Sequence, residues 1–241
     1  MNSAIVYWTP YSHPNKKDYA NLLYSDPENI LKTLKPSKNA RGAGSQYISC
    51  SSAKEMYKNT FVLSSPIAST VNIIKNNNQN FIDNESGFWQ LNEETVNNRN
   101  RIDLDVSYLF FSEESMNISQ YPPYLHKTNF MNTSTVAAGK FNISKWLRPI
   151  NVSFILWENE NSITINKNEP LSYVNFETDK KIILKKFELT EEIYSIVQAN
   201  FLYRNIFPFT PLNNLYNTFV KSSRNKIVLN LIKNNLTEKY G

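Results

Sequence analysis

Trp146 and Arg148 are the residues whose types and spacing most suggest chemistry, and Pro149 follows them directly. On a strand, residues two apart share a face, so this ring and this guanidinium could stack or hold an anion. The alternative is a packed tryptophan beside an arginine that pairs with a carboxylate across the sheet. We favour the alternative, because most tryptophans in folded domains are packed for structural reasons.

Asp103 and Asp105 form a second pair, two residues apart at the start of an apolar run that ends at Phe111. If they point to one face, they could serve general acid and base chemistry or bind a hard cation. Half-buried strands more often place such residues on their solvent face or use them to guard an edge. We favour this structural interpretation and keep both residues as candidate ligand contacts.

Histidine and cysteine are scarce in this chain, with His13, His126 and Cys50 as the only examples. Neither histidine has an acid two residues later, which disfavours a facial-triad iron site, and a zinc site lacks ligands. The single cysteine excludes an internal disulfide, and we interpret it as an ordinary thiol. We therefore expect no metal and no cofactor. His126 remains a candidate ligand contact. A serine–histidine–aspartate triad or a cysteine–histidine pair stays open, because spacing in the sequence does not reveal either.

The elements that must position these residues are mainly strands. Three runs rich in β-branched and aromatic residues, 139–157, 162–178 and 180–189, predict a β-meander separated by turns at 158–161 and 178–180. The same criterion predicts further strands, and it predicts a loop for residues 112–135. These shorter strands are residues 4–9, 61–63, 70–75, 81–82, 88–91 and 106–111. The predicted fold is mainly β within an α+β whole, an antiparallel β-sandwich or jelly-roll-like domain over residues 1–189.

A helical segment is predicted for residues 190–241. Thr190 precedes two acids, and Thr210 precedes Pro211, so each threonine is a predicted helix cap. Apolar residues follow both starts at helical spacing. This segment packs on the sheets or on a partner, and we favour the sheets because an exposed apolar stripe lowers solubility.

The net charge is +5 and comes mostly from lysine. Lysine lacks the forked geometry with which arginine recognises bases and phosphates, so a nucleic-acid partner is disfavoured. Lys180, Lys181, Lys185 and Lys186 form the densest cluster, which we interpret as the guard of an edge strand. No apolar run is long enough to span a bilayer, so we expect no membrane partner. The absence of an apolar leader and of cysteine pairs suggests a reducing cytoplasm.

Four short motifs occur at residues 15–18 (NKKD), 58–61 (KNTF), 141–149 (FNISKWLRP) and 169–171 (EPL). They resemble motifs of uncharacterised proteins encoded by tailed phages of marine bacteria. The likeness covers most of residues 5–190, and the helical tail lies outside it. It implies a viral origin, with action in the host cytoplasm during infection or in the virion, and it brings no known activity.

A looser resemblance concerns residues 139–142 and 163–171, which are similar to the closing strands of dUTPase-like trimeric β-folds. The serine-rich phosphate motif and the catalytic aspartate turn of that family have no match here. Asn168 stands where that family has glycine. This resemblance implies shared turn geometry and no shared activity.

Two hypotheses about function follow. The first is a virus-encoded protein without enzymatic activity, which acts by protein binding, by self-association or as a virion or assembly component. The second is a small-ligand-binding protein or an enzyme of the β-sandwich class, with a pocket near Trp146 and Arg148 that Asp103, Asp105 and His126 border. A ligand protein should show a concave pocket in which these polar groups converge.

Overall fold

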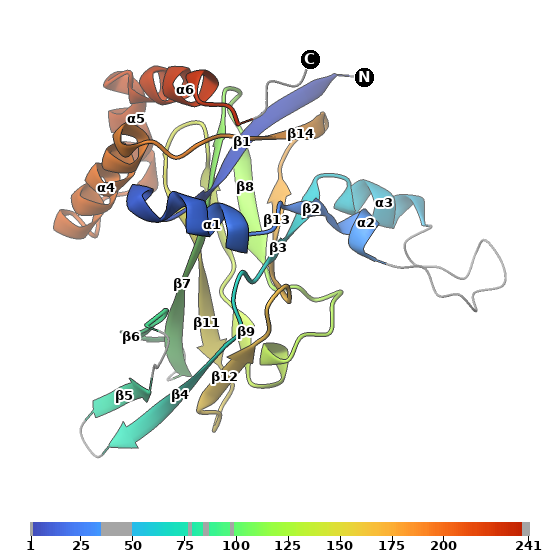
Figure 1. The fold of residues 1–241 in the computed structure, drawn as a ribbon, viewed down its shortest axis with the longest axis vertical. Coiled ribbons are helices and arrows are strands. Elements are labelled where there is room, and N and C mark those ends of the chain that lie inside the picture. Colours follow the sequence, from blue (N-terminus) through green and yellow to red (C-terminus); the bar gives the residue numbers. More distant parts are fainter. Residues whose placement is uncertain (1, 35–49, 77–78, 84–86, 97–98, 238–241) are drawn as a thin grey trace.

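The computed structural model describes residues 2–34, 50–76, 79–83, 87–96 and 99–237, which form a mixed α+β fold (Figure 1). The strands are β1 (Ser3–Tyr11), β2 (Glu28–Asn29), β3 (Thr60–Ser64), β4 (Ser69–Asn76), β5 (Gln79–Asp83), β6 (Trp89–Val96), β7 (Arg99–Ser112), β8 (Asn117–Tyr121), β9 (Ser134–Val136), β10 (Gly139–Asn142), β11 (Pro149–Leu156), β12 (Ser162–Ile165), β13 (Pro170–Phe176) and β14 (Lys181–Lys186). The α-helices are α1 (Lys17–Leu23), α2 (Ile30–Thr33), α3 (Ser51–Tyr57), α4 (Glu191–Ile206), α5 (Leu212–Lys221) and α6 (Arg224–Asn234).

The strands form three sheets. The first sheet has the order β14-β1-β7-β11-β9, with β6 also pairing with β7. The second has the order β10-β8-β13-β3-β2, and the third has the order β12-β4-β5. Among the strand pairs of the described residues, only β1 and β14 run parallel.

The first and second sheets share one apolar core, as the inner faces of a sandwich do. The first sheet contributes Val6, Trp8, Phe110 and Ile182 among others, and the second contributes Phe61, Leu63, Ile118, Val174 and Phe176. This agrees with the predicted sandwich at the level of a mixed, sheet-rich fold. The jelly-roll-like strand order stays a prediction.

The predicted β-meander is wrong. The strands β11, β12, β13 and β14 all form, but none pairs with another of the four. They pair instead with β7 and β9, with β4, with β3 and β8, and with β1. Local composition identifies strands, whereas their partners lie far away in the sequence. The predicted loop 112–135 is also wrong, because β8 forms within it and β9 begins there.

The helical tail packs on the outer face of the first sheet, and Figure 1 shows α4, α5 and α6 gathered at one end of the molecule. Tyr7 and Phe111 of the sheet share a cluster with Val197, Phe219 and Val228 of these helices, one from each.

Candidate functional site

Trp146 and Arg148 lie in the connection between β10 and β11 rather than on a strand. The side chain of Asn142 accepts a hydrogen bond from the amide of Ser144 at 3.1 Å, an Asx turn that ends β10. The Arg148 guanidinium carbon lies 5.2 Å from the ring centroids of both Phe141 and Trp146. The pair therefore stacks, and Arg148 has no carboxylate partner among the described residues.

Arg148 is half-buried, and the cavity beside its neighbour Trp146 is small. Burial, together with the charge of Arg204, lowers the pKa of Arg148 below its ordinary value, and Tyr216 opposes this effect. The neighbouring cavity has a volume of about 30 Å³ and is lined by Trp146 and Tyr203 among others. A cavity of this size holds about one water molecule.

Asp103 and Asp105 lie on β7 between buried neighbours, and Asp103 is half-buried whereas Asp105 is exposed. Asp103 forms an ion pair with Arg101, at 3.4 Å between Oδ1 and Nε. Pro149 pairs with Leu109, which lies six residues along β7 from Asp103 and hence about 20 Å away. The two acids are therefore far from Trp146 and Arg148. No group of three or more acid, histidine or cysteine side chains suited to a metal occurs in the described residues.

His126 lies in a third place, against β13 of the second sheet. Its Nδ1 is 2.5 Å from the hydroxyl of Tyr173, and that hydroxyl also accepts a hydrogen bond from the amide of Leu125 at 3.1 Å. Burial raises the pKa of Tyr173 and lowers that of His126. The five residues that the sequence proposes as one site are thus dispersed over three places.

A groove lies between the outer edge of β14 and the segment that carries β2 and α2, and we call it the β14 groove. Two adjoining hollows of about 660 Å³ and about 420 Å³ form it, with Asn29, Lys32 and Phe61 in both. Ile182 and Leu184 line the β14 side. The remaining lining residues are Asp26, Pro27, Glu28, Leu31, Lys54, Glu55, Lys58 and Lys181.

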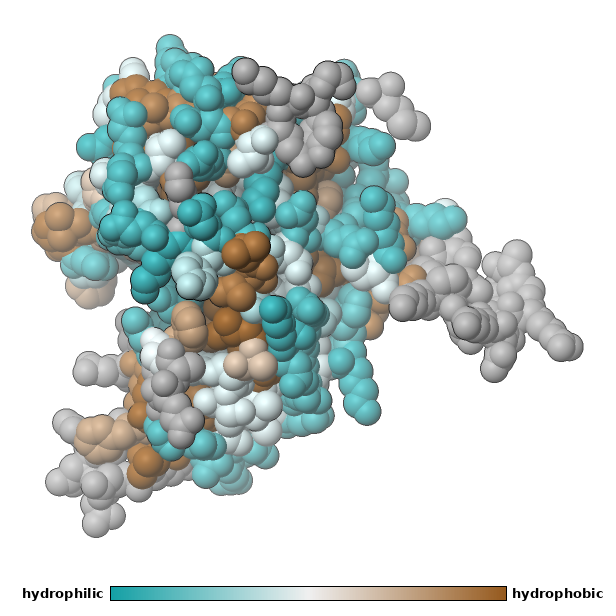
Figure 2. All heavy atoms as spheres, viewed as in Figure 1, coloured by the Kyte–Doolittle hydropathy of each residue, from teal (hydrophilic) through white to brown (hydrophobic). Residues whose placement is uncertain are grey.

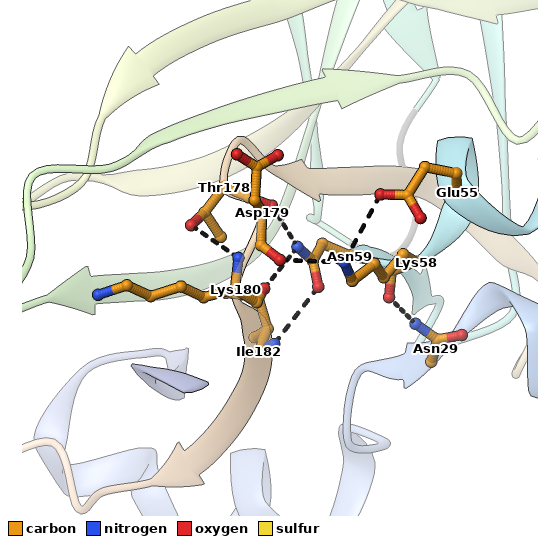
Figure 3. A network of polar contacts seen from close by, with 8 residues as sticks. All are labelled: Asn29, Glu55, Lys58, Asn59, Thr178, Asp179, Lys180 and Ile182. Carbon is orange, nitrogen blue, oxygen red and sulfur yellow. Dashed lines mark hydrogen bonds and ion pairs between the residues drawn. The ribbon is translucent and has the colours of Figure 1, made fainter. Parts of the chain in front are cut away.

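One end of the β14 groove is closed by the polar network in Figure 3, with the buried Asn59 at its centre. Its Nδ2 donates to the carbonyls of Thr178 and Lys180, at 2.7 and 2.9 Å. Its Oδ1 accepts a hydrogen bond from the amide of Ile182 at 3.3 Å. The carboxamide therefore pairs with the β14 backbone as a neighbouring strand would.

The backbone edge beyond this network is open. Lys181 donates its amide toward β1, so the alternate residues of β14 turn their backbone groups away from it. Thr237 donates to the Lys186 carbonyl and closes the far end. Within the described residues, four groups between these ends have no hydrogen-bond partner: the carbonyls of Ile182 and Leu184 and the amides of Leu184 and Lys186.

Charge is unevenly distributed along the β14 groove. Lys32, Lys54 and Lys181 have no ion pair within the described residues, and all three are exposed. Lys58 lies 3.5 Å from Glu55 and donates to the carbonyl of Asp179. At the other end, Asp26 lies 3.7 Å from Lys186 across the groove. The exposed Glu28 also lines that end.

A second candidate surface is an apolar corner where α4 meets α5, which Figure 2 shows as a cluster of hydrophobic side chains. Phe209 is 96% exposed there. Its exposed neighbours are Leu202, Tyr203, Ile206, Phe207 and Leu212. Exposed apolar patches of this kind often mark interaction surfaces.

The chain matches no family model, no curated protein and no solved structure. In the described part of the chain, no helix is both long enough and apolar enough to cross a bilayer. Sequence reasoning found the lysines of β14 but missed the groove, because its walls come from segments about 120 to 150 residues apart in the chain. The lysine cluster was the only sequence feature that indicated β14 as an edge strand.

Proposed function

We propose that this protein is a protein-binding module that receives an extended segment of a partner on the open edge of β14. The observation that carries this proposal is the row of four unpaired backbone groups facing a groove. A strand added to such an edge supplies main-chain hydrogen bonds, and the pockets beside it recognise alternate side chains.

The dimensions of the β14 groove support this proposal. Five residues, from Ile182 to Lys186, line this edge, and the four rises between them correspond to about 13 Å of extended chain. Phe61 and Ile182 belong to the shared core of the two sheets, so an inserted apolar side chain would extend that core. The hydrogen bond between Ile182 and Asn59 closes one end of the groove, and the ion pair between Lys186 and Asp26 closes the other. These two contacts would hold the edge in place before a partner binds.

The alternative of a small ligand near Trp146 and Arg148 has less support. Ligand pockets usually have volumes of about 300 to 1,000 Å³, whereas the cavity beside Trp146 has about 30 Å³. The exposed corner around Phe209 also favours a protein partner, because it offers a second apolar contact surface. From the resemblance to phage proteins, we propose that the partner is a virion protein or a protein of the infected host.

The test is selection of short random linear peptides on the purified protein, followed by binding to a Leu184→Pro variant. Proline removes the outward amide of Leu184 and is tolerated at an edge position whose amide has no ladder partner. Leu184→Ala is the matched control, because it shortens the same side chain and keeps the amide. We expect selected peptides to bind Leu184→Pro about tenfold more weakly than Leu184→Ala.

Hydrogen exchange supplies an independent measurement. Bound peptide should slow exchange of the amides of Leu184 and Lys186, because each gains an acceptor. Equal binding to both variants, with unchanged exchange along β14, would show that the edge is not the binding site. Thermal unfolding of both variants checks that the fold persists.

A further inference from the structure

The two ends of the β14 groove differ in charge, which constrains the peptides that the groove can bind. Lys54 and Lys181 lie at the end where β14 begins, and no carboxylate pairs with either within the described residues. Glu28 and Asp26 lie at the other end, beside Leu184. Lys32 also lines that end and Lys186 pairs with Asp26 there, so its charges largely cancel. A strand in this groove therefore meets a net positive charge only at the end where β14 begins.

The middle of the groove is apolar. Phe61 and Ile182 are 8% and 7% exposed, and the partly buried Leu184 packs against the same cluster. Side chains of a strand alternate between two faces, so every second residue of an added strand would point toward this floor. The floor suits β-branched or other apolar side chains, while the residues between them face solvent.

The lysines also indicate which strands the edge rejects. Edge-to-edge pairing of two copies of β14 would bring Lys181, Lys185 and Lys186 of one copy close to those of the other. Like charges on neighbouring strands destabilise pairing, so a second copy is a poor occupant. A carboxylate on the incoming strand would convert this repulsion into attraction.

We infer that the β14 groove selects an extended peptide with a carboxylate beside Lys54 and Lys181 and an apolar side chain over Phe61 and Leu184. This inference rests on the proposed function and names the chemistry of its partner. The carboxylate can belong to an aspartate or glutamate side chain or to the end of a chain.

The probes are short peptides of alternating valine and threonine, labelled with a fluorophore and blocked at both termini. One pair carries two aspartates at the amino or the carboxyl end, and a second pair carries asparagines there instead. An asparagine peptide with a free carboxyl terminus separates a chain-end carboxylate from a side-chain carboxylate. Binding is measured by fluorescence anisotropy at two salt concentrations.

We expect one aspartate peptide to bind about tenfold more tightly than its asparagine counterpart, with a smaller advantage at high salt. The double variant Lys54→Glu, Lys181→Glu should lose this advantage. Its control, Lys221→Glu with Lys226→Glu, carries the same change of net charge at two exposed lysines of the tail that do not line the groove. The control should keep the advantage.

The outcomes separate the inference from the function on which it rests. If aspartate and asparagine peptides bind equally and Leu184→Pro weakens both, the groove binds strands and the inferred carboxylate is wrong. If the aspartate advantage persists in the Lys54→Glu, Lys181→Glu variant, the carboxylate contacts another surface and the inference is also wrong. If Leu184→Pro affects no peptide, the inference and the proposed function both fail.

Discussion

Asn59 shows how one side chain can take the place of a strand. Its carboxamide offers two donors and one acceptor to the start of β14, where a neighbouring strand would offer backbone amides and carbonyls. It is 4% exposed, so these bonds form away from water, and a lost partner would leave buried polar groups unsatisfied. The open stretch of the edge therefore begins where the reach of this side chain ends.

His126 should make stability depend on pH. Because burial raises the pKa of Tyr173, its hydroxyl stays protonated and can donate to Nδ1 of His126, which must then be neutral. Burial lowers the pKa of His126, so the unfolded chain binds the proton more readily. The stabilisation is present above about pH 6.5 and is lost as pH falls through the folded pKa.

The measurement is the midpoint of thermal unfolding between neutral and mildly acidic pH, for the wild type and for His126→Gln. We expect the wild-type midpoint to fall more steeply with acidification than that of the variant. Tyr173→Phe removes the partner hydroxyl but leaves His126 beside a buried ring, so the dependence that burial causes should persist. Parallel curves for the wild type and His126→Gln would rule out the titration of His126 as the origin.

At the scale of elements, the sequence predicts which segments are strands better than it predicts their partners. The runs at β1, β3 and β7 are recognisable because β-branched and aromatic residues gather in them. The pairing of β1 with β14 joins residues about 180 positions apart, and no local pattern carries that information. The five proposed site residues were dispersed for this reason, because their proximity depended on pairings that the sequence did not specify.

The two predicted helix caps, Thr190 and Thr210, differ in the structure. The sequence marks Thr190 and Thr210 alike, but only Thr190 accepts a hydrogen bond from the helix it precedes, from Ile193 at 3.3 Å. Pro211 occupies the cap position of α5, and Thr210 instead offers its carbonyl to Arg204. Because Pro211 takes the cap position, α5 begins one residue later than the sequence predicts. The Thr210 side chain therefore caps no helix.

Thr190→Ala should therefore reduce the free energy of unfolding by about 1 kcal/mol, because the first turn of α4 loses its side-chain acceptor. Thr210→Ala should change it by less than about 0.5 kcal/mol. Urea unfolding followed by circular dichroism measures both. Equal losses in the two variants would contradict the assignment of the cap.

At the scale of the whole molecule, charge and exposed apolar surface both gather in the tail. Residues 193–237 contain no aspartate or glutamate and five basic residues, which equals the net charge of the whole chain. Lys233 bonds to Glu113 next to β7, at 2.9 Å, so part of this charge is neutralised across the contact between tail and sheet. The tail is thus joined to the sheets by an apolar cluster and by an ion pair, while its far corner remains exposed.

Two phenylalanines test whether the tail and the sheets unfold as one unit. Phe219 is 2% exposed in the cluster between α5 and the first sheet, and Phe209 is 96% exposed at the corner. Phe219→Ala should lower the free energy of unfolding by about 3 to 5 kcal/mol, because it leaves a cavity in a packed cluster. Phe209→Ala should change it by less than about 0.5 kcal/mol.

The readouts are helix content by circular dichroism and the environment of the sheet tryptophans by fluorescence, both during urea unfolding. If the tail and sheets form one cooperative unit, Phe219→Ala shifts both transitions to the same lower urea concentration. A shift of the helix signal alone would show that residues 190–241 unfold separately, and the packing of α5 would then add little to the sheets. Phe209→Ala should leave both transitions in place and weaken the binding of an apolar dye, because the corner loses its most exposed ring.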